Sequence, residues 1–120
     1  KGNSRLHGEP FNFGPPPQQN HAVGELVSAM SEHWDKVRWG DVSTHNDGPY
    51  ESGLLKLNCD KALHYLGWQA AWGFHDTVKE TALWYKRFYE NPSDSIVDFS
   101  LHQIASYIEA AQLQGIAWAQ

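Results

Sequence analysis

Apolar residues return at helical spacing between positions 22 and 34, and this pattern most constrains how the chain can fold. The residues are Val23, Leu26, Val27, Met30 and Trp34, at positions i, i+3, i+4, i+7 and i+11. This spacing places them on one face of a helix with 3.6 residues per turn. The spacing predicts an amphipathic helix over 22–34 whose apolar side packs against the rest of the chain.

A second, shorter helix is indicated by residues suited to its two ends. Asn58 or Asp60 provides a side chain that accepts a hydrogen bond from the first turn of a helix. Gly67 fits the left-handed position that commonly follows the last turn. We therefore expect a short helix that ends at Leu66, followed by an aromatic loop over 68–75.

Capping residues also place two helices in the second half of the chain. Asp76 or Thr77 begins a helix that runs to about residue 89, before an Asn-Pro pair, and the segment Thr-Val-Lys-Glu at 77–80 matches a capping box. The segment Ser-Leu-His-Gln at 100–103 matches a second one. It predicts a final helix from Ser100 that ends at Gly115.

Three short segments resemble β-strands, namely Pro10–Phe13, Val37–Val42 and Leu54–Leu57. They are too short and too widely separated to form a large independent sheet. Together with the helices they predict an α+β fold, rich in helix, in which residues 1–120 form a single small lobe. Helices and strands this sparse often complete the cleft of another domain.

Composition excludes several classes of function. The net charge is −5 and the basic residues are scattered, so nucleic-acid binding is not expected. No apolar run approaches the ~20 residues that a membrane span requires. No charged segment followed by an apolar run opens the sequence, so a signal peptide is not expected. Cys59 is the one cysteine in the sequence and cannot form an internal disulfide, which favours a cytoplasmic protein.

Four segments follow one another in a fixed order. They are Gly-Glu-Pro-Phe-Asn-Phe-Gly-Pro at 8–15, Leu-Lys-Leu-Asn-Cys-Asp-Lys-Ala at 55–62, Leu-Gly-Trp at 66–68 and Thr-Ala-Leu-Trp-Tyr at 81–85. In this order they resemble the closing third of extended short-chain dehydrogenases/reductases that act on nucleotide sugars. The first two segments are most similar to the CDP-glucose 4,6-dehydratase branch of that family.

The resemblance implies a division of labour between two domains. In such an enzyme an upstream Rossmann domain binds NAD and carries the catalytic tyrosine and lysine, while the C-terminal lobe closes over the nucleotide sugar. The present 120 residues contain no Gly-x-Gly-x-x-Gly and no Tyr-x-x-x-Lys segment. We therefore expect a substrate-binding lobe for CDP-glucose that is inactive by itself, contains no catalytic residue and does not bind NAD.

The resemblance also implies where the nucleotide binds. Relatives carry a short Pro-x-Glu or Pro-x-His element that touches the nucleotide, and here the matching residues are Gly48, Pro49, Tyr50 and Glu51. Glu51 would accept hydrogen bonds from ribose hydroxyls, and Tyr50 would stack on the base or bond to it. Many relatives have a basic residue where Gly48 stands. Either diphosphate binding falls to the other domain, or the correspondence with the relatives does not hold at this loop. A solvated loop carboxylate is the alternative for Glu51.

The remaining reactive side chains favour structural roles. The seven histidines form no His-x-x-x-His pair, and Cys59 has no Cys-x-x-Cys partner, so no metal site is expected. Cys59 and His64 are five residues apart, which does not place them side by side on a helix. Five of the tryptophans could line a binding cleft, but core and interdomain packing is the commoner role. Trp68, which follows the helix stop, is the foremost core candidate.

Two alternatives remain open. The chain could be a separate binding or interaction module derived from this family, or it could be the corresponding lobe of a related nucleotide-sugar epimerase or dehydratase. In either case the surface that meets a missing Rossmann domain should be apolar. Exposed surfaces of this kind promote association, so we also expect self-association.

Overall fold

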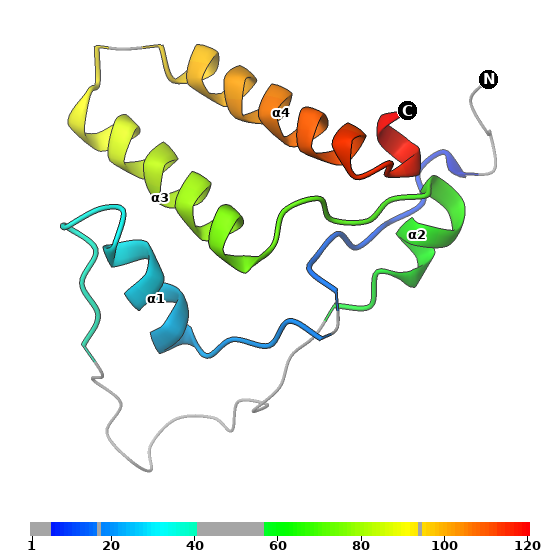
Figure 1. Cartoon of the computed structure of the whole chain (residues 1–120), viewed down its shortest axis with the longest axis horizontal. Coiled ribbons are helices and arrows are strands. Elements are labelled where there is room, and N and C mark those ends of the chain that lie inside the picture. The colour runs from blue at the N-terminus through cyan, green and yellow to red at the C-terminus, as the bar shows by residue number, and fades with distance from the viewer. Residues whose placement is uncertain (1–5, 17, 41–56, 94) are drawn as a thin grey trace.

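The computed structural model describes residues 6–16, 18–40, 57–93 and 95–120. Four α-helices and one short 3₁₀-helix follow in order (Figure 1): α1 (Val23–Ser31), α2 (Asp60–Leu66), α3 (Phe74–Glu90), α4 (Ile96–Leu113) and η2 (Ala117–Ala119). All of the regular secondary structure in these ranges is helical. The described part of the chain is therefore all-α, and the α+β prediction was wrong.

The expected strands are not found where the structure describes them. Pro10–Phe13 is extended chain without a sheet partner, and its nearest cross-chain bond is from the Asn12 side-chain amide to the carbonyl of Asn58, at 3.3 Å. Residues 37–40 form no strand either, and the rest of Val37–Val42 lies outside the described residues, as does most of Leu54–Leu57. A strand satisfies its backbone groups only beside another strand, and in the described ranges none is available.

Helix α1 begins and ends inside the predicted range of 22–34. The Glu25 carboxylate accepts a hydrogen bond from the backbone N–H of Ala22 at 2.9 Å, which closes the first turn. The regular helix ends at Ser31, and Trp34 lies in the turn that follows, where its N–H bonds to the carbonyl of Met30. No residue of α1 is buried, so its apolar side is only partly covered.

The predicted C-terminal end of helix α2 is confirmed, but its N-cap position is Cys59 and neither of the two expected residues. Asn58, one residue earlier, still accepts a hydrogen bond from the Asp60 N–H at 2.9 Å. The helix runs over Asp60–Leu66, and Gly67 adopts the left-handed conformation with φ of 64°. The Gly67 N–H bonds to the carbonyl of Leu63, and the Trp68 N–H bonds to that of Ala62. Glycine pays little steric penalty at positive φ, which explains the sharp stop at this position.

Helices α3 and α4 both begin earlier than the capping boxes indicated. Helix α3 starts at Phe74, so Thr77 lies within its first turn and its N–H bonds to the carbonyl of Gly73. Helix α4 starts at Ile96, and its cap is Ser95, whose hydroxyl accepts a hydrogen bond from the Asp98 N–H at 3.2 Å. Both capping-box predictions were wrong, although the helices themselves were correctly expected.

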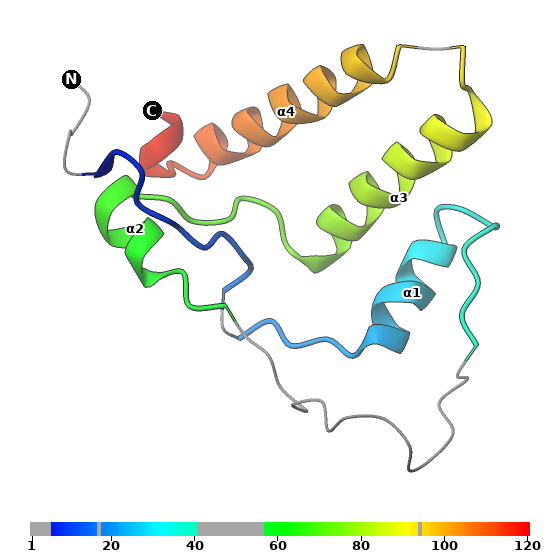
Figure 2. The same cartoon turned by 180° about the vertical axis from the view of Figure 1, so that it is seen from behind.

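Helices α3 and α4 form an antiparallel hairpin, and α1 lies beside α3 (Figures 1 and 2). The indole N–H of Trp84 donates to the Ser100 hydroxyl at 2.9 Å, and the Gln103 amide donates to the Glu80 carbonyl at 2.8 Å. Helix α2 lies at the other end of the molecule, near η2. The chain before α1 and the loop after α2 therefore lie between α1 and α2.

The core of the described chain is small. The buried apolar side chains are Ala62, Ala71, Val78, Ala82, Ala111 and Ile116. One cluster joins the loop after α2 to the C-terminus through Ala71, Ala111 and Ile116. No large side chain of the described residues is fully buried, and Trp68, the expected core residue, is only half-buried.

Candidate functional site

The nucleotide-contacting loop expected from the sequence cannot be placed. Gly48, Pro49, Tyr50 and Glu51 lie outside the described residues. The described chain leaves off at Gly40, beyond α1, and resumes at Leu57, shortly before α2. The site can therefore be built only from the residues around these two points.

A groove of about 680 Å³ opens among the described residues. Its walls come from the chain before α1, from α1 itself, from the loop between α2 and α3, from the start of α3 and from α4. Its main contributors are Phe13, Pro15, Pro16, Gln19, Asn20, His21, Val23, Leu26, Leu57, Trp68, Trp72, Phe74, Thr77, Val78 and Tyr107. The volume is in the range typical of pockets for small molecules.

Three pairs of rings give the groove its aromatic walls. Phe13 meets Trp68 edge to face with ring centroids 5.0 Å apart. Trp72 meets Tyr107 in the same way at 4.9 Å. His21 stacks on Phe74 at 3.6 Å. The sequence analysis favoured a packing role for the tryptophans. Trp68 and Trp72 line an open groove, which agrees with the alternative of an aromatic cleft for these two.

Hydrogen bonds hold the aromatic loop of the groove onto α4 and the C-terminus. The Ala71 N–H donates to the Tyr107 hydroxyl at 3.1 Å, and the Gln114 amide donates to the Ala71 carbonyl at 2.9 Å. The Trp118 indole donates to the carbonyl of Gln69 at 3.0 Å. These bonds satisfy backbone groups that a loop would otherwise expose, so they fix the direction of Trp68 and Trp72. The contribution of α4 to this site was not expected from the sequence.

The described lining of the groove is almost free of charge. It contains no Asp, Glu, Lys or Arg, and its polar side chains include Gln19, Asn20, His21 and Thr77. His21 also lies 3.5 Å from the Glu25 carboxylate, which is exposed outside the groove. Such a lining suits an uncharged ring, such as a base or a sugar, and lacks the cations that a diphosphate requires.

A second hollow of about 450 Å³ continues the groove towards α2. The two share Gly14, Pro15, Pro16, Leu57, Trp68 and Ala70. The second adds Asn58, Cys59 and Asp60. Asp60 is engaged at the helix start, where its N–H and its carboxylate both bond to the Asn58 side chain.

The reactive side chains singled out from the sequence are not brought together. The Cys59 thiol lies 3.9 Å from the carbonyl of Leu57, and the ring of His64 packs edge to face on Tyr65. Among the described residues no three His, Cys, Asp or Glu side chains are grouped as metal ligands. Within the same residues no helix has the length and hydropathy to cross a bilayer.

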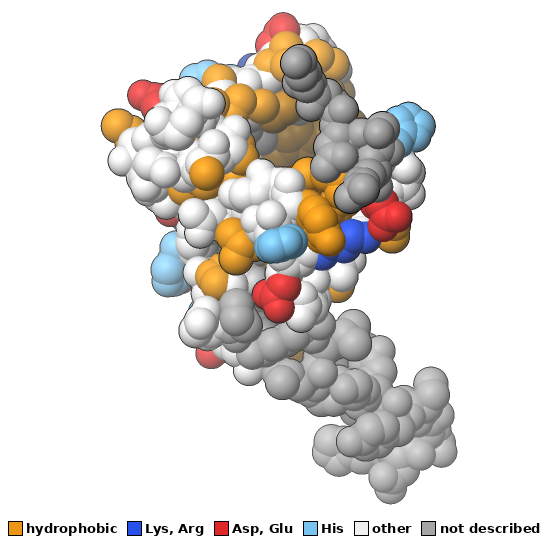
Figure 3. Space-filling model, turned by 90° about the vertical axis from the view of Figure 1, so that its right-hand side faces the viewer, with side chains coloured by type: hydrophobic (Ala, Val, Ile, Leu, Met, Phe, Trp, Pro, Cys, Tyr) orange, Lys and Arg blue, Asp and Glu red, His pale blue; other side chains and the backbone are white. Residues whose placement is uncertain are grey.

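Figure 3 shows that hydrophobic side chains gather on the face that contains α2 and the C-terminus. In α2 and just before it, Leu57, Leu63, Tyr65 and Leu66 are all exposed, at 40–59% of their full area. An apolar surface around a groove is typical of a site that binds another molecule or domain.

Comparison with known proteins finds a curated enzyme that is similar to this chain. The chain is 30% identical over 103 residues to the CDP-glucose 4,6-dehydratase of Salmonella typhimurium, a match that covers 85% of this chain. The chain spans only 28% of the length of that enzyme. No family model matches the sequence, and no solved structure matches the fold. The similarity supports a distant relationship to CDP-glucose 4,6-dehydratase.

Proposed function

We propose that this chain is the nucleotide-sugar-binding lobe of an enzyme related to CDP-glucose 4,6-dehydratase, with CDP-glucose as its ligand. The observation that carries the proposal is the 30% identity that extends over 103 residues of this short chain. The aromatic groove supports it, because its uncharged walls suit a base or a sugar ring.

The lack of charge in the groove determines which parts of the nucleotide sugar it would bind. The described groove offers stacking surfaces and neutral polar groups, while Tyr50 and Glu51 remain the proposed contacts to the base and the ribose. The diphosphate would be held by groups outside the groove. In this proposal the lobe orients the sugar, and a sugar held in place reacts faster than one that must first be aligned.

NAD chemistry belongs to the other part of the proposed enzyme. The described residues contain no glycine-rich turn between a strand and a helix, which is the usual seat of a dinucleotide. In this proposal the lobe does not bind NAD, and we assign no catalytic step to it. Hydride transfer would take place on the Rossmann domain that the resemblance implies.

A titration of four nucleotide sugars tests the proposal. CDP-, UDP-, GDP- and dTDP-glucose are added to isotopically labelled protein, and amide chemical shifts are followed because weak binding is still visible by this method. We expect CDP-glucose to bind most tightly and to shift residues of the groove, including Trp68 and Trp72. Equal shifts with all four sugars, or none, would contradict the proposal, while a preference for another base would assign the chain to a related epimerase or dehydratase.

Glu51 provides the sharper test. Loss of a charged acceptor to a ribose hydroxyl should weaken binding about tenfold, so Glu51→Gln should raise the dissociation constant of CDP-glucose by that factor. Glu32→Gln, which changes an exposed carboxylate at the end of α1, is the matched control and should leave binding unchanged. Equal affinities of the two variants would remove Glu51 from the site.

A second function, that of an interaction module, is favoured by a different observation. Helices α3 and α4 expose large apolar and aromatic side chains away from the groove. These surfaces have no role in nucleotide-sugar binding as proposed above.

A further inference from the structure

Helix α4 presents a continuous apolar stripe to solvent. Val97, Leu101, Ile104 and Ile108 are 63%, 58%, 55% and 38% exposed. Their spacing of four, three and four residues places them on one side of the helix, as in the seam of a coiled coil. The side that meets α3 is a different one, since Ser100 and Gln103 make the contacts there.

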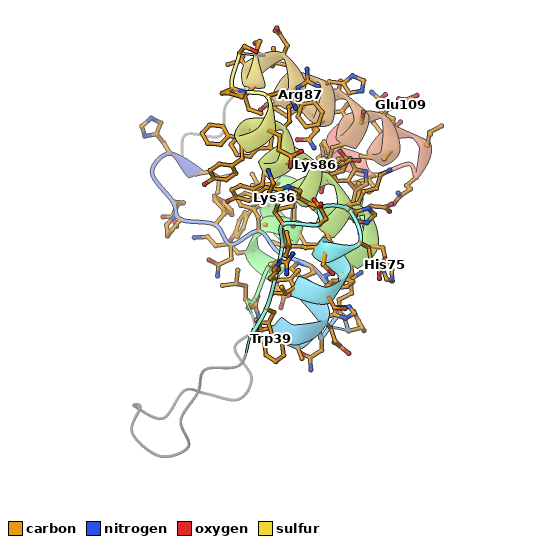
Figure 4. The ribbon with its side chains drawn as sticks, turned by 90° about the vertical axis from the view of Figure 1, so that its left-hand side faces the viewer. Lys36, Trp39, His75, Lys86, Arg87 and Glu109 are labelled. Atoms are coloured by element: carbon orange, nitrogen blue, oxygen red, sulfur yellow. The ribbon has the colours of Figure 1, made fainter. Side chains whose placement is uncertain are left out.

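The charge on α4 is entirely acidic. Asp98 and Glu109 are its only fully charged side chains, and the helix contains no Lys or Arg. Both carboxylates lie on the flank of the stripe that faces away from α3, by helical geometry. Figure 4 shows Glu109 projecting outward from α4. A partner that covers the stripe must therefore tolerate or complement negative charge.

Helix α3 presents an aromatic surface made of Tyr85, Phe88 and Tyr89. These side chains are 43%, 46% and 63% exposed, and Tyr85 stacks on Tyr89 at 6.4 Å. Lys86 borders this surface, since it lies three residues before Tyr89 on the helix. Lys86 forms no ion pair with any described residue, although its charge acts on nearby Glu90. In Figure 4, Lys86 and Lys36 lie on the side of α1 and α3, away from Glu109.

We propose that the chain associates head to tail with copies of itself, the apolar stripe of α4 in one copy docking on the aromatic surface of α3 in the next. Charge complementarity selects this arrangement. Two α4 stripes face to face would bring acidic flanks together, and two α3 surfaces would bring Lys86 towards Lys86, whereas α4 on α3 pairs a carboxylate flank with a lysine. The proposal does not depend on the nucleotide-sugar function.

The arrangement has a geometric consequence. The two docking surfaces are different, so each bound copy still offers one free stripe and one free aromatic surface. Such heterologous contacts form open chains unless the rotation between copies closes a ring. We therefore expect the average mass to keep growing with protein concentration, beyond that of a dimer.

Sedimentation of two complementary variants tests the proposal. Leu101→Asp with Ile104→Asp disables the stripe, and Tyr85→Asp disables the aromatic surface; circular dichroism verifies that each remains helical. Each variant alone should be a monomer at concentrations where the wild type associates. An equimolar mixture should form a heterodimer and nothing larger, because one intact stripe then meets one intact surface.

Each other outcome overturns the proposal. Association by Tyr85→Asp alone would show that stripes pair with stripes, and association by the double variant alone would show that aromatic surfaces pair. A wild type that stays monomeric at every concentration would exclude both. Leu113→Asp is the matched control on α4, because Leu113 is 84% exposed but lies outside the stripe, and it should associate like the wild type.

Reversing the charges on both surfaces provides a test that a folding defect cannot imitate, because mixing the two variants should restore binding. Lys86→Glu should weaken association by roughly twofold to fivefold, the range for one exposed ion pair. Asp98→Lys with Glu109→Lys should weaken it similarly. A mixture of Lys86→Glu with the α4 lysine variant should restore the wild-type affinity of the contact between opposite charges. Failure of this rescue would reject the proposed pairing.

Discussion

Glu90 connects the end of α3 to the segment after α1. Lys36 lies 3.0 Å from its carboxylate and the Trp34 indole donates to it at 3.1 Å. The hydrogen bond from Lys36, followed by that from Trp34, holds the pKa of Glu90 below its ordinary value. A carboxyl whose pKa is lower in the folded state stabilises the fold above its unfolded pKa, and this stabilisation is lost as the pH falls through the folded pKa.

The first prediction therefore concerns thermal stability at acidic pH. Glu90→Gln should lower the midpoint of thermal unfolding near neutral pH, and the difference from the wild type should shrink and vanish as the pH falls through the lowered pKa of Glu90. Thermal melts monitored by circular dichroism over this range provide the measurement. Glu32→Gln, at an exposed carboxylate without an ion pair to any described residue, should show no such trend. A gap that stays constant with pH would show that the ionised carboxylate is not the cause.

Ser95 caps α4, and its removal should cost more than removal of Thr77. Ser95→Ala deletes the acceptor for the Asp98 N–H, so we expect a loss of about 1 kcal/mol in the free energy of unfolding. Thr77→Ala should be neutral or slightly stabilising, because Thr77 lies inside α3 and alanine favours helix. Urea unfolding of the two variants compares them directly, and equal losses would contradict the assignment of Ser95 as a cap and of Thr77 as an ordinary helix residue.

At the scale of elements, the sequence predicted the helix ends that depend only on residues close along the chain. Gly67 marked the end of α2 because its left-handed conformation is a local property. The start of α4 was missed because Ser95 and Asp98 form the cap where Ser100 and Gln103 had matched the pattern, and those two residues instead bind Trp84 and Glu80 of α3. Choosing between two possible caps requires knowing which side chains the neighbouring helix needs.

The strands and the groove depend on residues distant in the sequence, and there prediction failed or stayed incomplete. Phe11 and Phe13 alternate as in a strand, but the chain at Pro10–Phe13 has no neighbouring strand in the described ranges. Trp68 was expected in the core, yet Ala71, Ala111 and Ile116 form the buried cluster, and the Trp68 indole lies at the groove. Periodicity indicates which residues are apolar, and only packing decides which of them are covered.

The Gln103 amide makes two of the hydrogen bonds that join α3 to α4. Gln103 donates to the Glu80 carbonyl at 2.8 Å and also to its carboxylate at 2.9 Å. We expect Gln103→Ala to lower the free energy of unfolding by about 1–2 kcal/mol, because two half-buried acceptors lose a partner. His102→Ala changes the exposed neighbour and should have little effect. Urea unfolding measures both, and similar results would show that the bonds from Gln103 to Glu80 do not stabilise the hairpin.

At the scale of the whole molecule, the described fold buries little apolar area for its length. Its buried apolar side chains are mostly alanines, and residues as large as Tyr89, Leu101 and Leu113 are more than half exposed. The heat-capacity change of unfolding reflects the apolar surface that unfolding newly exposes. Surface that is already exposed in the folded chain contributes nothing to it.

This gives a quantitative expectation for calorimetry. Typical proteins gain about 12–15 cal/mol/K per residue, or about 1.4–1.8 kcal/mol/K for 120 residues. We expect a clearly smaller value for this chain at concentrations low enough to keep it monomeric. Binding of a dye such as ANS to the folded protein should accompany it, since the groove and the stripe are open to solvent. A heat-capacity change at or above the typical range, without dye binding, would mean that the apolar surfaces of α3, α4 and the groove are covered within a single chain.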